Sequence, residues 1–272
     1  MILDTCYWLS DTRHPLGYLP TPAELWTVAQ MFDVSIFMHQ GLYDGVAGDD
    51  GHEPRSPEPP YIVPVKTRLK RLITLAATWK HALCLYVSWF YARRAGFTPA
   101  QFVAAVRNLK AVTGCFNWYV DGIGFQYGLD AGATSDENRW VINMLRQYAG
   151  ANGIVAVHVS QPDGRGGYTT PDWKALERVD LTIDGEGIVL GRDAEFDKEW
   201  LSGHLLSGPA GKPFASLAKG HDPAWLVEHG ASLVGHVGTK TGADGYPHFT
   251  SGLTDQVVAV RRARAAAGRL YG

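Results

Sequence analysis

Long hydrophobic runs are missing from this chain. No stretch approaches the roughly 18 consecutive apolar residues that a membrane-spanning helix requires, and the start Met-Ile-Leu-Asp-Thr-Cys lacks the basic and then apolar profile of a signal peptide. Neither sign of charge is in excess, because 25 Lys and Arg residues stand against 27 Asp and Glu residues. We therefore expect no membrane partner, no nucleic-acid partner and a cytoplasmic location.

Cysteine is scarce, and Asn-x-Ser/Thr glycosylation sites are absent. Cys6, Cys84 and Cys115 are far apart in the sequence, and the last two lie within apolar runs. We expect all three to be buried free thiols.

Several cofactor and nucleophile motifs are also absent. No Gly-Lys-Ser/Thr phosphate loop occurs, and Gly122-x-Gly124 is followed by Gly128, which breaks the dinucleotide-binding spacing. No Gly-x-Ser-x-Gly motif occurs, which argues against a serine esterase. We expect no cofactor.

What the chain does have is a regular alternation of strand-length apolar runs and helical stretches. The predicted strands lie near 2–8, 34–40, 82–89, 116–123, 153–160, 179–185, 213–219 and 231–237. The predicted helices lie near 21–32, 67–80, 98–113, 135–148, 194–206, 223–229 and 254–267. Strand-then-helix repetition is typical of a parallel sheet. With no internal repeat and no linker, the pattern predicts an α/β fold, a (β/α)8 TIM barrel forming a single domain over residues 1–272.

The polarity within each run predicts which residues face the barrel interior. The predicted inward residues are Ser35, Phe37 and His39 in the second run; Cys84, Tyr86 and Ser88 in the third; Asn117, Tyr119 and Asp121 in the fourth; Ala156, His158 and Ser160 in the fifth; and Thr182, Asp184 and Glu186 around the sixth. This face turns polar toward the carboxyl ends of the strands, where barrels of this kind keep their active sites.

Carboxylates are the candidate catalytic groups. Glycoside hydrolysis needs two of them, one that attacks or activates water and one that protonates the leaving oxygen. We expect Asp121 as nucleophile or stabilising carboxylate, Glu186 as proton donor, and Asp184 as the reserve for either role. The alternative for Asp121 is structural, because Asp-Gly is a common turn dipeptide.

Aromatic, histidine and lysine side chains near the strand ends are candidates for binding a saccharide. The predicted substrate-binding residues are His39, Tyr86, Trp89, Tyr119, His158, Lys219 and His236. The three histidines with Asp121 could also hold a metal, but the first run reads Cys6-Tyr7-Trp8 and lacks the His-x-His of metal-dependent hydrolase barrels. We expect no metal.

The segments 61–88, 117–125 and 155–186 together resemble the barrel domains of glycoside hydrolases, especially the melibiase (α-galactosidase)-like and spherulin-like polygalactosaminidase groups. The resemblance to the first group implies an aspartate nucleophile at Asp121 and an acid/base at Asp184 or Glu186. The chain departs from the α-galactosidases at Tyr119, where they carry a lysine. A saccharide is the implied substrate. The alternatives are a non-catalytic glycan-binding barrel and a metal-dependent hydrolase.

Overall fold

A computed structural model describes residues 4–9, 20–38, 67–123, 133–158, 172–184, 214–217, 223–228, 231–237 and 253–268. The strands are β1 Thr5–Leu9, β2 Val34–Met38, β3 Ala82–Ser88, β4 Trp118–Asp121, β5 Val155–His158, β6 Leu181–Asp184, β7 Phe214–Leu217 and β8 Ala231–Val237. The helices are α1 Pro22–Met31, α2 Thr67–Thr78, α3 Trp89–Arg94, α4 Pro99–Thr113, α6 Ser135–Ala149, α8 Pro223–Glu228 and α9 Leu253–Ala266.

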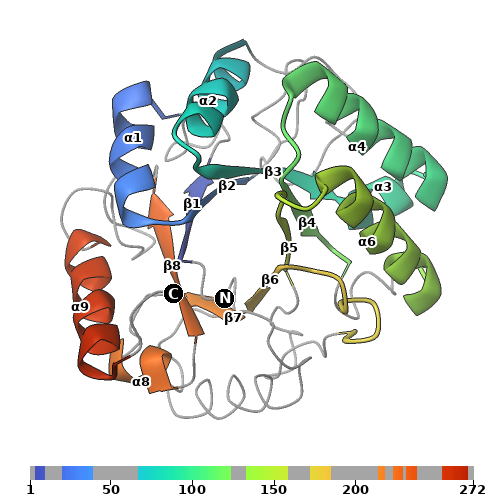
Figure 1. Cartoon of the computed structure of the whole chain (residues 1–272). Helices are drawn as coiled ribbons and strands as arrows, with labels where there is room; N and C mark the ends of the chain where they lie inside the picture. The colour runs from blue at the N-terminus through green and yellow to red at the C-terminus, as the bar shows by residue number, and fades with distance from the viewer. Residues whose placement is uncertain are drawn as a thin grey trace.

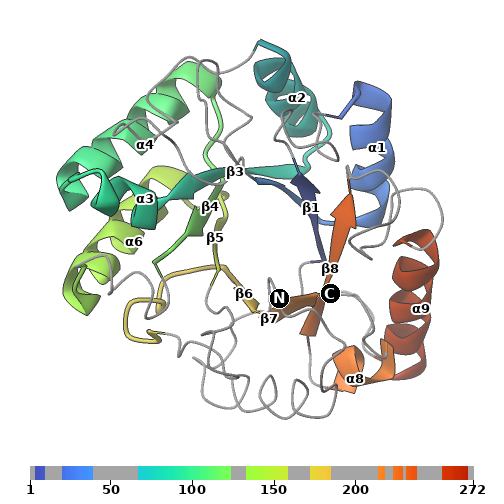
Figure 2. The same cartoon turned by 180° about the vertical axis from the view of Figure 1, so that it is seen from behind.

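The strands form a closed parallel barrel, in which each pairs with the next and β8 pairs with β1. Figures 1 and 2 show them at the centre with the helices outside. The prediction of an α/β fold on a parallel sheet is therefore confirmed. Between β5 and β6, residues 173–178 form turns, and the predicted helix near 194–206 lies outside the described residues. A helix after every strand is accordingly not seen in the part of the chain that the structure describes.

Three helices have a threonine as N-cap, directly before their first residue. Thr21, Thr98 and Thr134 each accept a hydrogen bond from the backbone N–H three residues on, and the side chain at that third position bonds back. This capping box satisfies backbone donors that would otherwise lack a partner at the start of a helix. The boxes fix where α1, α4 and α6 start relative to the strands they cover.

A buried ion pair lies at the amino-terminal end of the barrel. Asp4, just before β1, accepts two hydrogen bonds from Arg264 of α9, at 2.6 and 2.8 Å, and both side chains are 2% exposed. The carboxylate also accepts the backbone N–H of Leu233 in β8 at 2.9 Å. Arg261 donates to the Met31 carbonyl at the end of α1. The arginines of α9 thus tie the last helix to the first strand and the first helix.

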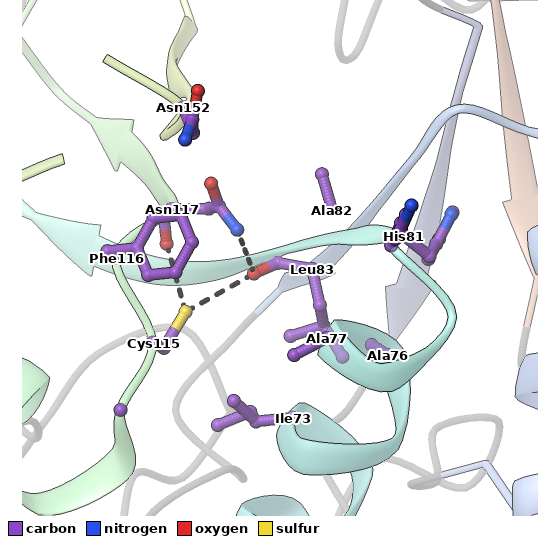
Figure 3. A pocket seen from close by; sticks show the side chains of 12 residues that line it. Ile73, Ala76, Ala77, His81, Ala82, Leu83, Cys115, Phe116, Asn117 and Asn152 are labelled. Atoms are coloured by element: carbon purple, nitrogen blue, oxygen red, sulfur yellow. Dashed lines mark hydrogen bonds between the residues drawn. The ribbon is translucent and has the colours of Figure 1, made fainter. Parts of the chain in front are cut away.

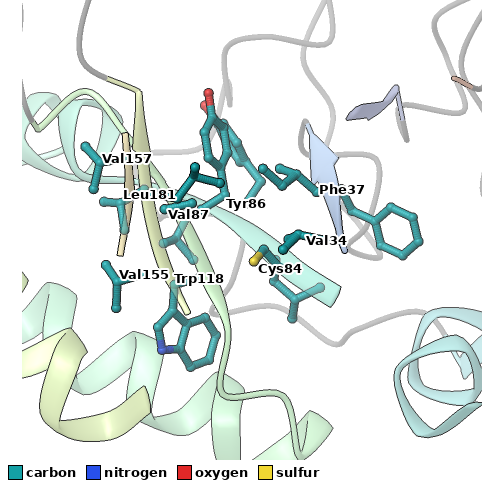
Figure 4. Packing of buried hydrophobic residues seen from close by; sticks show 14 of the residues in the cluster. Val34, Phe37, Cys84, Tyr86, Val87, Trp118, Val155, Val157 and Leu181 are labelled. Carbon is teal, nitrogen blue, oxygen red and sulfur yellow. The ribbon is translucent and has the colours of Figure 1, made fainter. Parts of the chain in front are cut away.

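One face of the sheet packs against the helices. The side chain of Trp118 in β4 is directed toward the helices, so its face is the outer one (Figure 4). Leu85 of β3 pairs in register with Trp118 and with Phe37 of β2, and Leu83, two residues before Leu85, shares their face. All four strand residues are buried. The hydrophobic layer between barrel and helices therefore runs across these strands.

The opposite parity forms the barrel interior. Tyr86 pairs in register with Tyr119, and Ser88 pairs with Asp121. Figure 4 shows Trp118 directed toward the helices and Tyr86 directed away from them. The inward facing predicted for Tyr86 and Ser88 in the third strand and for Tyr119 and Asp121 in the fourth is confirmed. Asn117, predicted inward as well, precedes β4 and lines a cavity at the amino-terminal end of the barrel.

The inward facing predicted for Ser35 and Phe37 in the second strand, and for Thr182 and the position of Asp184 in the sixth, is wrong. His39 and Glu186 of the same predicted sets lie outside the described residues. Phe37 lies on the outer face, as its pairing with Leu85 requires. In β5, Val155 pairs with the outward Trp118, and Val157, two residues on, shares the same outer face. Thr182 of β6 pairs with Val157 and is therefore on the outer face as well. The inner positions of these two strands are held by the opposite parity, which includes Ile36 in β2 and Leu181 in β6.

Ser35 of β2 shows why polarity misled the prediction. It is completely buried, and its hydroxyl is hydrogen-bonded to the Cys6 thiol at 3.3 Å and to His81 Nε2 at 3.0 Å. A parallel sheet covered by helices is buried on both faces, so a small polar residue with local partners does not mark the side open to solvent.

Candidate active site

Asp121 lies at the carboxyl end of β4 and is less buried than the three residues before it. One carboxylate oxygen, Oδ2, accepts a hydrogen bond of 2.9 Å from the Tyr86 hydroxyl. Ser88, the last residue of β3, stands beside Asp121 in the register. The pairing aligns Tyr86-Val87-Ser88 with Tyr119-Val120-Asp121, so that two tyrosines lie one layer below a hydroxyl and a carboxylate.

Tyr86 is held firmly in this position. Its side chain is 5% exposed, and its ring packs against the completely buried ring of Tyr119 at a centroid distance of 6.0 Å. Burial, and then the charge of Asp121 and the presence of Tyr91, raise the pKa of the Tyr86 phenol well above its ordinary value. Tyr86 is therefore a neutral hydrogen-bond donor.

Helix α3 begins at the residue after β3, without a loop. Ser88 is its N-cap, and the Ser88 hydroxyl accepts the backbone N–H of Tyr91 at 3.3 Å. This start brings the backbone of Phe90 against the end of β4. The first turn of α3 therefore forms one wall beside Asp121.

The position of Gly122, directly after Asp121, requires a glycine. Its φ is +71°, and a Cβ built there would lie 2.2 Å from Cβ of Phe90. Only glycine tolerates this approach together with this backbone conformation. Packing thus accounts for the glycine, whereas it gives no reason for the aspartate that precedes it.

Trp89 is not brought to the barrel mouth. It is completely buried, donates its indole N–H to Asn138 Oδ1 of α6 at 2.8 Å, and packs against Phe102 of α4. The assignment of Trp89 as a substrate-binding residue is therefore corrected, because no face of its ring is left for a sugar. Tyr119 is likewise completely buried and supports Tyr86 from behind.

The other predicted site residues are described in part or not at all. His158 is the last residue of β5 and pairs with Ile183, Asp184 is the last residue of β6, and His236 lies in β8. The structure describes the backbone of His158, Asp184 and His236 and not their side chains. The register of β6 puts the position of Asp184 on the same face as Thr182 and not on that of Asp121. Glu186, His39 and Lys219 lie outside the described residues.

Ser88 is the residue at this site that the sequence-based choice of site residues left out. Its signal was present in the sequence, since Tyr-Val-Ser in one strand and Tyr-Val-Asp in the next have the same spacing. Once the two strands are paired in register, the serine must stand next to the aspartate.

No group of three or more His, Cys, Asp or Glu side chains that could hold a metal ion occurs within the described ranges. All three cysteines are free and buried, as predicted. Burial raises the pKa of Cys6 and Cys115 to about 12 and that of Cys84 well above its ordinary value. These thiols stay protonated at neutral pH, which makes them poor nucleophiles and metal ligands.

A cavity of about 380 Å³ lies at the opposite end of the barrel, where β3 and β4 begin. Its lining includes Cys115, whose thiol donates to the Leu83 carbonyl at 3.3 Å, and Asn117, whose side-chain amide donates to the same carbonyl at 3.5 Å (Figure 3). Asn117 also accepts the Ile154 N–H at 2.9 Å. The amino-terminal end of such barrels usually serves stability and not catalysis. The polar groups of Cys115 and Asn117 form hydrogen bonds that link the first residues of neighbouring strands.

No helix in the described part of the chain combines the length and the apolar character needed to cross a bilayer.

Comparison with known proteins gives a likeness of fold. No protein-family model and no curated protein matches the sequence. Among solved structures, the chain is similar to the alpha-amylase of Geobacillus thermoleovorans complexed with acarbose, with a TM-score of 0.59 and 9% identity over 98% of this chain and 80% of that one. An Anoxybacillus alpha-amylase gives a TM-score of 0.60 and 8% identity over 98% and 78% of the two chains.

An enzyme of another class is similar as well. A proposed phosphonomutase from Burkholderia cenocepacia gives a TM-score of 0.50 and 12% identity over 85% of this chain and 86% of that one. Identities this low show the shared fold alone. The neighbours thus include TIM-barrel glycoside hydrolases, in agreement with the coarser prediction, while the melibiase-like and spherulin-like groups stay predictions.

Proposed function

We propose that this chain is a glycoside hydrolase that cleaves an O-glycosidic bond of an oligo- or polysaccharide with two carboxylates. In this proposal residues 1–272 form a single domain with a complete (β/α)8 arrangement. The observation that carries it is Asp121, a partly exposed carboxylate at the carboxyl end of a barrel strand that accepts a hydrogen bond from a buried tyrosine. The fold shared with two alpha-amylases supports it.

The proposed reaction divides two roles between carboxyl groups. Asp121 attacks the anomeric carbon, or stabilises positive charge there, as the glycosidic bond breaks. Glu186 or Asp184 donates its proton to the departing oxygen, so that a neutral alcohol leaves. Water then attacks the anomeric carbon and displaces the Asp121 carboxylate wherever a covalent bond to it has formed, while the proton of the water returns to the second carboxylate. Binding of the saccharide hydroxyls is assigned to His39, His158, Lys219 and His236.

Replacement of Asp121 by asparagine tests the proposal. Asp121→Asn should lower turnover of a responsive glycan or aryl glycoside by on the order of a thousandfold or more, because the attacking charge is lost. Asp136→Asn is the matched control, since the Asp136 side chain is 71% exposed on α6 and its ion pairs with Arg139 and Lys174 lie on the surface. It should leave turnover unchanged.

Three results would reject the proposal. The first is unchanged turnover in Asp121→Asn. The second is glycan binding without turnover by the unaltered protein across a broad screen, which would indicate a non-catalytic glycan-binding barrel. The third is a stoichiometric zinc or manganese content, which would indicate a metal-dependent hydrolase.

The identity of the proton donor can be tested separately. Loss of the donor slows substrates with poor leaving groups far more than those with activated phenols, because the latter need little protonation. Asp184→Asn and Glu186→Gln should therefore be compared on a series of aryl glycosides. The residue whose replacement steepens the dependence on leaving-group pKa is the acid.

A further inference from the structure

The hydrogen bond between Tyr86 and Asp121 points to a role other than saccharide binding for the tyrosine. We propose that Tyr86 is a positioning residue, whose phenol holds the Asp121 carboxylate ionised and in one orientation. As a role in catalysis this rests on the proposed function, although the contact itself can be tested without any substrate.

The geometry fixes the direction of the bond. The Tyr86 hydroxyl lies 2.9 Å from Oδ2 of Asp121, and an ionised carboxylate can only accept, so the phenol donates. Tyr86 and Asp121 come from adjacent strands, and their backbones are locked by the register of β3 and β4. Hydrogen bonds with one charged partner are the stronger ones in proteins. The contact is therefore suited to fixing the rotamer of Asp121.

Burial suits Tyr86 to positioning better than to contact with a substrate. Only 5% of its surface is exposed, and the ring is backed by Tyr119. A saccharide hydroxyl therefore finds little of Tyr86 to bind. Asp121 is more exposed and stands one layer closer to the carboxyl ends of the strands. The effect of Tyr86 on a substrate is consequently transmitted through Asp121.

The groups around the pair come from four elements. Tyr91 faces Tyr86 from α3, and Tyr119 packs on it from β4. The position of His158 at the end of β5 shares the inner face with Ala156, the register partner of Tyr119, and its side chain lies outside the described ones. The position of Asp184 in β6 is on the opposite face. The guanidinium groups of α3 lie over aromatic rings, that of Arg93 over Trp89 and that of Arg94 over Phe90. The Tyr86 phenol donates to Asp121, and the Ser88 hydroxyl of β3, which also interacts with Tyr86, stands beside the pair in the register.

Linkage gives the sign of the expected change. A donor bonded to the charged form of an acid favours ionisation, so removing it raises the pKa of the acid. Tyr86→Phe deletes only the hydroxyl and keeps the ring that packs on Tyr119. The matched control is Tyr148→Phe on α6, which removes a phenol hydroxyl from a partly buried residue elsewhere in the fold.

The decisive measurement is a carbon-13 NMR titration of the Asp121 carboxyl, assigned by its loss in Asp121→Asn. The midpoint should move to higher pH in Tyr86→Phe and stay in place in Tyr148→Phe. An Asp121 midpoint that Tyr86→Phe leaves in place would overturn the proposal. A second measurement needs no variant, because the ζ-carbon of Tyr86 should shift with the midpoint of Asp121. Independent midpoints would also overturn it.

Kinetics separate this proposal from the proposed function. On a responsive glycoside, Tyr86→Phe should lower kcat about tenfold to a hundredfold with little change in KM, and should move the acidic limb of the kcat/KM profile to higher pH. A rise in KM alone would assign Tyr86 to substrate binding and reject positioning. A shifted Asp121 midpoint in a protein that cleaves no glycoside would support the contact while rejecting glycoside hydrolysis.

Discussion

Replacing Gly122 by alanine should disturb the site far more than the same change at Gly114. The two glycines have nearly identical φ values, +71° and +72°, both in the left-handed region. An alanine at either position therefore carries a conformational cost of about 1–2 kcal/mol. The large difference between the two positions is in what the new methyl group meets.

The structure supplies that difference. At Gly122 the methyl carbon would lie 2.2 Å from Cβ of Phe90 and 3.1 Å from the Phe90 backbone nitrogen, whereas at Gly114 nothing lies within 4 Å. A Cβ cannot move by changing rotamer, so α3 or the end of β4 must shift. Overpacking of this kind adds about 1–3 kcal/mol. We expect Gly122→Ala to lower the free energy of unfolding by about 2–5 kcal/mol in all.

Urea unfolding of both variants measures the difference, with the slope of the transition checked for two-state behaviour. The carboxyl signal of Asp121 should also move in Gly122→Ala and stay in place in Gly114→Ala. Equal losses of stability in the two variants would refute the close approach of Phe90 to the end of β4. The steric explanation for the glycine after Asp121 would then fail.

Two further predictions concern buried polar groups. Asp4→Ala should lower the free energy of unfolding in urea by about 3–5 kcal/mol, because it leaves Arg264 charged and buried. The control Arg139→Ala breaks an exposed ion pair and should lower it by at most about 1 kcal/mol. Similar losses in the two variants would contradict a stabilising role of the buried pair. Burial lowers the pKa of His81 from 6.5 to about 4. Between these two pH values the unfolded chain therefore binds more protons than the folded chain. The free energy of unfolding should fall by up to about 3 kcal/mol as the pH drops from 6.5 to 4. His81→Gln keeps a hydrogen-bonding partner for Ser35 and should flatten this part of the pH profile, and an unflattened profile would reject the assignment to His81.

The parts of the fold that were predictable depend on patterns that any covered parallel sheet requires. The order of elements can be predicted from apolar runs of strand length and from the helices between them. N-cap residues such as Thr21 and Thr98 mark where those helices start, and each of these signals is local in the sequence. The start of α3 was not predictable in this way. Trp89 follows β3 with no turn residue between them, and its apolar character suits strand and buried helix equally well.

The facing of the strands shows where sequence patterns stop being informative. Tyr86 and Tyr119 were assigned to the interior correctly, while Phe37 and Thr182 were not. Polarity distinguishes two faces only when one of them meets water. In this barrel both are buried, so the facing is decided by pairing with neighbouring strands, which a single strand does not encode.

The same reasoning bears on the second carboxylate. Asp121 shares a face with Ser88 because β3 and β4 pair in register, and that register rests on contacts throughout both strands. The position of Asp184 alternates with that of Ile183, the partner of His158, so the register does not bring it to the face of Asp121. The register argues against Asp184 as the partner of Asp121 and does not bear on Glu186, which lies outside the described residues. Replacement of Glu186 by glutamine is therefore the more informative first experiment.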